Sequence, residues 1–226
     1  MSKEQIDTKA EPNQSGNTGS FVQENSKSLA IIGGAIVALV LLYIGYQKFY
    51  LAPRAEKAVN EMFKAEEYVA VDSLTEKAIK GEAGSYPGFE AIATEYSSTK
   101  SANLANAYLG GLYLKKGEYK KAIEALENYS ATGSPVIDPL VLGMIGDAYS
   151  ELKQYDDAVN YYQKAADKSP NSLTSPVFLK KAGLVYEEQK KYDDALAVYK
   201  KIKENYPESQ EASLIDAYIA RAEARL

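Results

Sequence analysis

The chain has 226 residues, of which 46% are hydrophobic and 25% charged, and this suffices for one good-sized folded domain with an appendage. It contains no cysteine and no histidine, which excludes disulfide bonds, zinc-finger ligation, thiol nucleophiles and every histidine-based catalytic arrangement. The formal net charge is −5 and no run of lysine or arginine exceeds two residues, which argues against nucleic acid as a partner.

The first segment of the chain, residues 1–28, is rich in Ser, Asn, Gln, Glu and Gly. It has few large apolar groups to bury, so we expect a disordered tail there. No pattern in this segment indicates a binding or catalytic site.

An uncharged apolar run, "LAIIGGAIVALVLLYIGY", follows at residues 29–46. As an α-helix it would be about 27 Å long, close to the roughly 30 Å of a bilayer's hydrocarbon core. A cleaved signal peptide is the alternative, but the run exceeds the usual apolar core of such peptides and no small-residue cleavage pattern follows it. We therefore predict a single transmembrane helix over residues 29–51.

Small residues recur every four positions in this run, at Ala30, Gly34 and Ala38. They share one helix face, on which another membrane helix could pack closely. Small residues are also common in membrane helices without any such role, so the packing face is a hypothesis.

The orientation of the span follows only weakly from charge. Lys27 lies on its amino side, whereas Lys48, Arg54 and Lys57 lie on its carboxyl side. Taken alone, positive-inside counting would keep the following domain in the cytoplasm.

Three segments of the remaining chain resemble one another: "LGGLYLKKGEYKKAIEAL", "IGDAYSELKQYDDAVNYY" and "AGLVYEEQKKYDDALAVY". The copies are 36 and then 37 residues apart, while the glycine-to-alanine interval within each copy is 12. The spacing within each copy is constant and the spacing between copies varies slightly, which predicts one helical hairpin repeated three times. The shared columns are Gly110, Gly146 and Gly183, then Tyr113, Tyr149 and Tyr186, then Ala122, Ala158 and Ala195.

Each copy is followed by a proline, Pro135, Pro170 or Pro207, which we expect to stop the second helix. This order of residues over 103–209 resembles the tetratricopeptide repeat. Asn106, Leu142 and Leu179 stand where the repeat consensus has tryptophan. The resemblance implies an all-α solenoid of stacked hairpins behind the single amino-terminal transmembrane helix.

Packing explains the repeated residue types. The small glycine and alanine are expected where the two helices of a hairpin cross, and larger residues are expected to fill the space between hairpins. These larger residues are Leu126, Tyr162 and Tyr199.

The pattern extends on both sides of the three units. Residues 52–102 are expected to form linker helices and a partial repeat, with a second helix at 88–96 whose partner lies within 54–80. Residues 210–226 are expected to form a capping helix.

Acidic pairs precede two of the apolar helical runs, as Asp156 with Asp157 and Asp193 with Asp194. A general acid and base is one interpretation, but carboxylates at this place more often cap backbone amides and favour the positive end of the helix. We predict no catalytic, cofactor-binding or metal-binding residue.

The concave wall of such a solenoid is formed by the first helix of each unit, and its side chains are small and apolar for the most part. A clamp for a terminal carboxylate needs several basic residues there, and only Lys180 fits, so a hydrophobic segment of another protein is the expected ligand. The alternative is that the chain's own helices cover these positions. The groove positions that the resemblance to the tetratricopeptide repeat implies are Leu104, Ala107, Gly111 and Leu114, then Leu140, Gly143, Asp147 and Ser150, then Val177, Lys180, Leu184 and Glu187.

The combination of a membrane helix, a linker helix, three repeats and a terminal cap resembles the ancillary SecYEG translocon subunit family. "LGMIGDAYSELKQYDDAVNYYQKAA" and "FLKKAGLVYEEQKKYDDALAVYKKIKENYP" carry the resemblance. It implies a bacterial inner-membrane protein with periplasmic repeats, in conflict with the charge count. The implied partners are the SecYEG translocon, a membrane-tethered peptidyl-prolyl isomerase or similar folding factor, and unfolded exported proteins. A membrane-anchored scaffold for cell-envelope or division machinery is the second hypothesis.

Overall fold

A computed structural model describes residues 22–226 of the chain. The chain divides between Ala52 and Pro53 into two units, and each is described by itself. Apart from one short hairpin of two strands, the described residues form helices and their connections.

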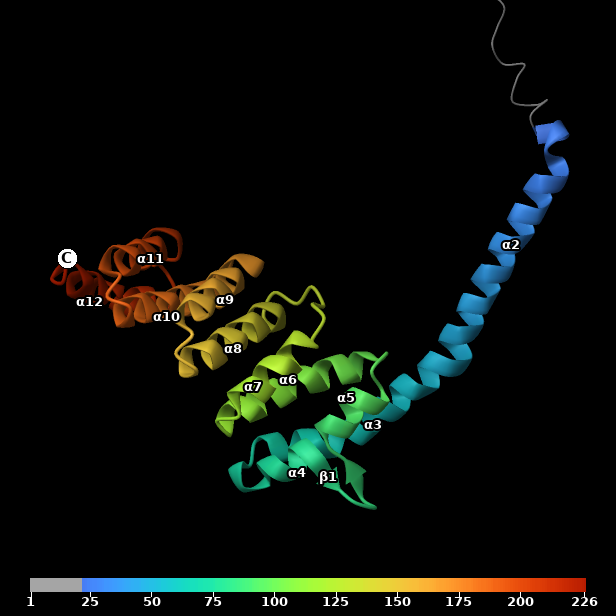
Figure 1. Ribbon diagram of the computed structural model, residues 1–226, viewed down its shortest axis with the longest axis horizontal. Helices are drawn as coiled ribbons and strands as arrows, with labels where there is room; N and C mark the ends of the chain where they lie inside the picture. Colours follow the sequence, from blue (N-terminus) through green and yellow to red (C-terminus); the bar gives the residue numbers. More distant parts are fainter. Residues whose placement is uncertain (1–21) are drawn as a thin grey trace, which may run out of the picture. The chain divides into compact units, whose positions relative to one another are not determined.

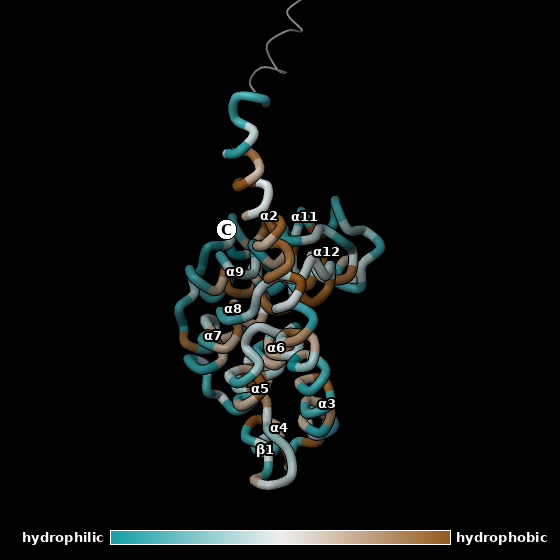
Figure 2. The backbone as a smooth tube through the Cα atoms, turned by 90° about the vertical axis from the view of Figure 1, so that its right-hand side faces the viewer, coloured by the Kyte–Doolittle hydropathy of each residue, from teal (hydrophilic) through white to brown (hydrophobic). Residues whose placement is uncertain are grey.

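The first unit is helical, with α2 at Ser26–Gly45 followed by a π-helical segment, η2, at Tyr46–Leu51. None of the α2 residues is buried, and Figure 2 shows much of α2 in apolar tones. Among the described residues, one helical segment, which begins at Ser26, is long and apolar enough to cross a membrane. An amino-terminal apolar helix is therefore present.

The helix begins earlier than the predicted Leu29. Residues 22–24 are also helical, so the end of the predicted disordered tail has regular structure, and residues 1–21 lie outside the described residues. Hydropathy locates the apolar run but not the ends of the helix. Polar residues such as Lys27 also take part in the backbone hydrogen bonds of a helix, so α2 extends beyond the run.

The second unit starts with elements that precede the repeats, and Figure 1 shows them in teal and green. The hairpin of β1 and β2 was not predicted, and it depends on Gly81 and Gly84, which have φ angles of 78° and 76° that favour glycine. The elements are α3 (Ala52–Val69), η3 (Asp72–Leu74), α4 (Thr75–Lys80), β1 (Gly81–Glu82), β2 (Tyr86–Pro87) and α5 (Phe89–Glu95).

One face of α3 contributes to the core of this part. Ala58, Met62 and Ala65 are buried at positions three or four apart, in a cluster that also holds Phe89 and Ile92 of α5. This spacing gives α3 one apolar face toward the core, while its other face stays exposed.

Three helical hairpins and a single helix follow, and Figure 1 shows them stacked in a row from α6 to α12. The predicted fold class, an all-α solenoid of the tetratricopeptide-repeat kind with an apolar helix before it, is confirmed. The helices are α6 (Lys100–Lys115), α7 (Tyr119–Glu127), α8 (Ile137–Glu151), α9 (Tyr155–Lys168), α10 (Ser175–Glu188), α11 (Tyr192–Asn205) and α12 (Ala212–Glu223).

The repeated glycines lie where the helices of a hairpin meet. A Cβ atom on Gly146 would stand 2.7 Å from the Tyr162 ring of α9, closer than carbon atoms pack. Gly183 lies against Tyr199 in the same way. The predicted crossing is correct, but the large residue packs on the glycine of its own hairpin as well as between hairpins.

The turns between the two helices of each unit share one backbone conformation. Gly117, Lys153 and Lys190 stand in the same column with positive φ angles of 74°, 59° and 58°. In the first unit the Gly117 amide donates to the Leu114 carbonyl and the Glu118 amide to the Tyr113 carbonyl, the Schellman pattern of a helix end. The repeat therefore reverses direction through a fixed turn.

The proline prediction is wrong for the first unit, because α7 ends at Glu127, well before Pro135. The connection is instead organised by Asp138, a residue that is 3% exposed. Its carboxylate accepts the Thr132 and Gly133 amides at 2.9 and 2.8 Å and the Tyr129 hydroxyl at 2.8 Å. Burial raises the pKa of Asp138, but these donors outweigh it and hold the pKa below its usual value.

Candidate functional site

An apolar pocket of about 410 Å³ lies between the first helices of the first two repeats. Among its lining residues Lys115 alone is charged, and its ammonium group is paired with Asp72. The pocket is lined by Val69, Leu104, Ala107, Tyr108, Gly111, Leu112, Lys115, Ile137, Leu140, Val141 and Met144.

The first helices of the repeats meet at two junctions, the first between α6 and α8 and the second between α8 and α10. The pocket exists because side chains of different size fill these two junctions. At the second junction the Phe178 ring of α10 packs directly on Gly143 of α8. At the first junction Val141 stands in the column of Phe178, and Ala107 stands in the column of Gly143. Valine is shorter than phenylalanine, so space remains between α6 and α8 and is open to solvent.

Four residues of the predicted groove line this pocket: Leu104, Ala107, Gly111 and Leu140. Leu140 is 46% exposed, and Gly111 has room beside it, since an added Cβ would find its nearest neighbour, the Met144 sulfur, at 3.7 Å. Leu114 is instead half-buried against the core of the first repeat.

Two predicted groove residues of the second unit, Gly143 and Asp147, contact other side chains of the solenoid itself. Gly143 is buried beneath Phe178 and is closed to a partner. The Asp147 carboxylate accepts the Tyr162 hydroxyl at 2.7 Å and the Lys181 ammonium at 2.6 Å. Burial, and then the charge of Asp147, raise the pKa of Tyr162. Asp147 thus joins α8 to α9 and α10.

In the third unit, α12 engages two of the predicted residues. Lys180 lies 3.6 Å from Glu211, just before α12, and Glu187 accepts Arg221 of α12 at 2.9 Å. Leu184, 38% exposed, lines a separate polar depression of about 490 Å³ together with Ser150 and Arg225. Val177 is half-buried. The ion pairs with α12 agree with the alternative that the chain covers part of its own groove.

The small-residue face of α2 is exposed along its length. Ala30, Gly34 and Ala38 are all exposed, and nothing lies within 4 Å of a Cβ built on Gly34. Within the described residues the face has no protein neighbour, so its role stays a prediction.

The acidic pairs do not cap their helices. The capping residues are Gln154 and Lys191, and neither helix has a side-chain cap, so the capping part of the prediction is wrong. Asp156 and Asp157 stand inside the first turn of α9, where the helix dipole favours them. Asp156 accepts from Gln189 at 2.8 Å and so joins the turns of neighbouring repeats.

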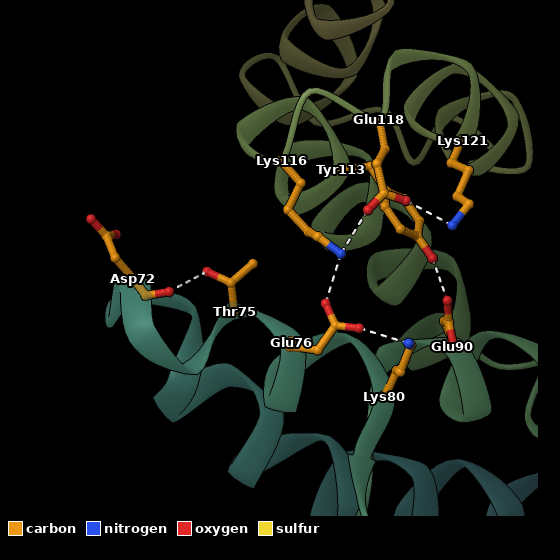
Figure 3. Close-up of polar contacts among 9 residues, drawn as sticks. All are labelled: Asp72, Thr75, Glu76, Lys80, Glu90, Tyr113, Lys116, Glu118 and Lys121. Carbon is orange, nitrogen blue, oxygen red and sulfur yellow. Dashed lines mark hydrogen bonds and ion pairs between the residues drawn. The ribbon is translucent and has the colours of Figure 1, made fainter.

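A network of charged residues joins α4 to the first repeat (Figure 3). The Glu76 carboxylate pairs with Lys116 at 2.6 Å and with Lys80 at 2.7 Å, and Lys116 also contacts Glu118 at 2.6 Å. The hydrogen bond from Lys116, followed by that from Lys80, lowers the pKa of Glu76 to about 2. Beside this network, the Tyr113 hydroxyl of α6 donates to the Glu90 carboxylate of α5.

Sequence reasoning missed the remaining lining residues of the pocket, which are Val69, Tyr108, Leu112, Lys115, Ile137, Val141 and Met144. The repeat column that contains Val141 and Phe178 could have indicated the pocket. A smaller side chain in one copy than in the next leaves space between the first helices of neighbouring repeats. Val69 lies outside the repeats, and no column comparison could have indicated it.

Residues 144–210 match the family model described as "Tetratricopeptide repeat". This stretch runs from the middle of α8 past the end of α11, so a tetratricopeptide repeat domain is present in the chain. Repeats of this kind bind other proteins, which makes protein–protein interaction the class of function that the fold defines. A comparison with curated proteins returned no match.

Proposed function

We propose that the protein is a membrane-anchored, non-enzymatic binding subunit associated with the SecYEG translocon. In this function it assists exported proteins on the periplasmic side of the bacterial inner membrane, together with a membrane-tethered peptidyl-prolyl isomerase or similar folding factor. The apolar pocket between α6 and α8 receives hydrophobic side chains of the unfolded client.

The observation that carries this proposal is an exposed apolar pocket on a repeat solenoid whose chain also has a membrane-length apolar helix. An unfolded chain exposes hydrophobic side chains that a folded protein buries. A pocket with one charged lining residue, itself paired, binds such side chains without requiring a charged group on the client.

The translocon part of the proposal depends on the resemblance of the repeats and their arrangement to the ancillary subunit family. The periplasmic orientation depends on the same resemblance and runs against the charges that flank the apolar helix. It is testable by protease digestion of membrane vesicles of known sidedness. Digestion of the repeats from the periplasmic face supports the proposal, whereas digestion only from the cytoplasmic face contradicts it.

A second function, a scaffold that holds one folded partner, is favoured by how much of the groove the chain fills itself. Phe178 closes the second junction, and Lys180 and Glu187 are paired with the α12 region. The apolar pocket between α6 and α8 stays open, and it is also suited to a few fixed side chains of one partner.

Crosslinking distinguishes the two functions. A photoreactive residue in place of Leu140 lies in the pocket, and one in place of Lys120, exposed on α7, is the matched control. In vesicles that translocate radiolabelled secretory chains, we expect the Leu140 probe to label translocating chains. Labelling of one folded protein in the absence of translocation would instead support the scaffold.

The difference between the junctions supplies a sharper variant. The double variant Ala107→Gly with Val141→Phe gives the first junction the residue types of the second junction, where the Phe178 ring packs on Gly143. The glycine is needed because the phenylalanine ring occupies the place of a Cβ atom. The pocket should be filled while the fold is kept, because an equivalent pair already packs in this chain. We expect loss of crosslinking from Leu140 with an unchanged circular dichroism spectrum.

A further inference from the structure

The two edges of the repeat stack differ in charge. One edge, called the charged edge below, is formed by the turns inside the hairpins, and each turn contains at least one lysine. These turns are residues 116–118, 152–154 and 189–191. The other edge, called the loop edge below, is formed by the connections that lead into α6, α8 and α10, and none of their residues is charged at neutral pH. These connections are residues 96–99, 128–136 and 169–174.

Hydrogen bonds place the connections of the loop edge side by side. Asn103, near the start of α6, exchanges two hydrogen bonds with the Ser130 backbone, at 2.8 and 2.7 Å. In the last of the three connections, the Asn171 side chain donates to the Pro135 carbonyl at 3.3 Å. The loop edge is therefore one continuous surface that extends across neighbouring repeats.

Two large apolar side chains are exposed on the loop edge. Leu173 is 67% exposed, in a turn that Asn171 fixes by accepting the Leu173 and Thr174 amides at 2.8 and 2.9 Å. Val136 stands at the equivalent position of the preceding repeat and is 41% exposed. Side chains of this kind gain free energy when they leave water, so a neutral edge that exposes two of them is suited to an apolar or interfacial partner.

The loop edge is bonded to the start of α3, where the second unit begins. Arg54, at the second position of this unit, donates to the Glu95 carbonyl at the end of α5. The Arg54 guanidinium also lies 5.5 Å from the centre of the Tyr96 ring, in the first connection of the loop edge. Beyond the other end of α3, Asp72 pairs with Lys115, next to the charged edge. The chain thus enters the second unit at its neutral edge.

We propose that the loop edge contacts the surface of the membrane, with Leu173 and Val136 inserted among the lipid headgroups. This inference rests on the membrane anchorage in the proposed function. The predicted span ends at residue 51, three residues before Arg54. The covalent chain therefore keeps the loop edge close to the bilayer, whereas the charged edge belongs to the end of α3 that is far along the chain from the span.

The anchor explains how two side chains suffice for this contact. On their own they would bind a bilayer weakly and reversibly. Attachment to a membrane helix makes their insertion an intramolecular step with a high effective concentration. The apolar pocket then opens beside the membrane surface, because Leu104 and Ile137 line it near the starts of α6 and α8.

The contact is measured with a fluorescent label on a single cysteine, since the chain has none of its own. Ser172→Cys reports on the loop edge with Leu173 retained, and Gln154→Cys reports on the charged edge; both positions are exposed. The full chain is reconstituted in phosphatidylcholine vesicles that carry a nitroxide quencher on part of the headgroups. We expect quenching at position 172 to be several-fold stronger than at position 154. Because the loop edge is neutral, the ratio should not change with added phosphatidylglycerol or at high salt.

A charge at the loop edge should release it from the bilayer. Leu173→Asp should reduce the quenching at position 172 several-fold, because a carboxylate resists transfer out of water. Val71→Asp is the matched control, since Val71 is 42% exposed beside Asp72, and it should leave the quenching unchanged. Both substitutions are at exposed positions, so we expect unchanged circular dichroism spectra.

Equal quenching at positions 172 and 154, in chains that float with the vesicles, would overturn the proposal, and so would a Leu173→Asp variant that is quenched like the unchanged chain. Protection of position 172 from aqueous iodide without quenching by the nitroxide lipid would also overturn it, because a second copy of the chain would then cover the loop edge. If the full chain does not float with the vesicles, the membrane anchorage in the proposed function is wrong, and the inference fails with it.

Discussion

Lys153 and Lys190 occupy a backbone conformation that costs a residue with a Cβ atom about 1–2 kcal/mol. Glycine stands at the equivalent position, Gly117, in the first repeat. The repeat register thus places a left-handed residue at each turn, and two of the three copies bear the strain of a lysine side chain there.

Lys190→Gly should therefore stabilise the protein by about 0.5–1 kcal/mol, because relief of strain exceeds the backbone entropy that glycine adds to the unfolded chain. Gly117→Ala should lose about 1 kcal/mol for the opposite reason. Urea unfolding of the full chain in mild detergent, followed by circular dichroism, measures both changes. A destabilised Lys190→Gly variant would show that the lysine side chain makes contacts that outweigh its backbone strain.

Gly146 and Gly111 both lie in first helices of the repeats but have opposite surroundings. A Cβ atom on Gly146 meets the Tyr162 ring at 2.7 Å, whereas one on Gly111 finds only the Met144 sulfur at 3.7 Å. Gly146→Leu should lower stability by about 1–3 kcal/mol or more through overpacking. Gly111→Ala should raise it by up to about 1 kcal/mol through helix propensity. Equal melting temperatures for the two variants would contradict the assigned hairpin crossing.

At the scale of elements, α4 is joined to the turn of the first repeat by the Glu76 network (Figure 3). The folded-state pKa of Glu76, about 2, lies below its ordinary value of 4.5. Its contribution to stability is therefore fully present above about pH 4.5 and is lost as the pH falls through about 2.

The difference in melting temperature between the unchanged protein and Glu76→Gln should consequently shrink between pH 5 and pH 2. The effect is small because the group is exposed and screened by solvent. Lys57, which pairs with Glu61 on α3, offers a control, since Lys57→Gln should give a difference that does not follow the Glu76 titration. A Glu76→Gln difference that is constant with pH would show that Lys116 does not stabilise α4 through this carboxylate.

Helices could be predicted where the same residue type recurs at equivalent positions of the repeats. Elements were missed where a single residue without a repeat determines the backbone conformation. The glycine column located the hairpin crossings because Tyr162 and Tyr199 fall at a fixed interval after it. The β1–β2 hairpin was missed because positive φ at Gly81 and Gly84 is a property of single positions without a repeat. The end of α7 was missed because the buried Asp138, and not Pro135, organises the following loop.

The pocket was predictable only in part, because copying groove positions between repeats assumes that the junctions are equivalent. They are equivalent in backbone but differ in side-chain size, with Val141 at one junction and Phe178 at the other. Leu104 and Leu140 therefore line an open pocket, while Gly143 is covered. The contribution of Val69 to the pocket depends on the tertiary packing of α3 beside the repeats, and no local pattern in the sequence indicates that packing.

At the scale of the whole molecule, a stack of repeats is quasi-one-dimensional, since each unit contacts only its neighbours. The last hairpin would expose its apolar face if nothing covered it. α12 covers it with Ile215, which stands in the column of Phe178 and is 1% exposed within the cluster that contains Tyr199 and Ile202. The cap is thus packed like the first helix of a further repeat.

Ile215→Ala should cost about 2–5 kcal/mol, the usual range for a buried aliphatic side chain whose cavity stays open. The adjacent Leu214 is 65% exposed, and Leu214→Ala should change stability by less than about 0.5 kcal/mol. Because coupling passes only between neighbours, hydrogen exchange in Ile215→Ala should accelerate most in α11 and α12 and least in α6 and α7. Uniform acceleration from α6 to α12 would mean that the three repeats unfold as one cooperative unit, and it would contradict nearest-neighbour stacking as the origin of the solenoid's stability.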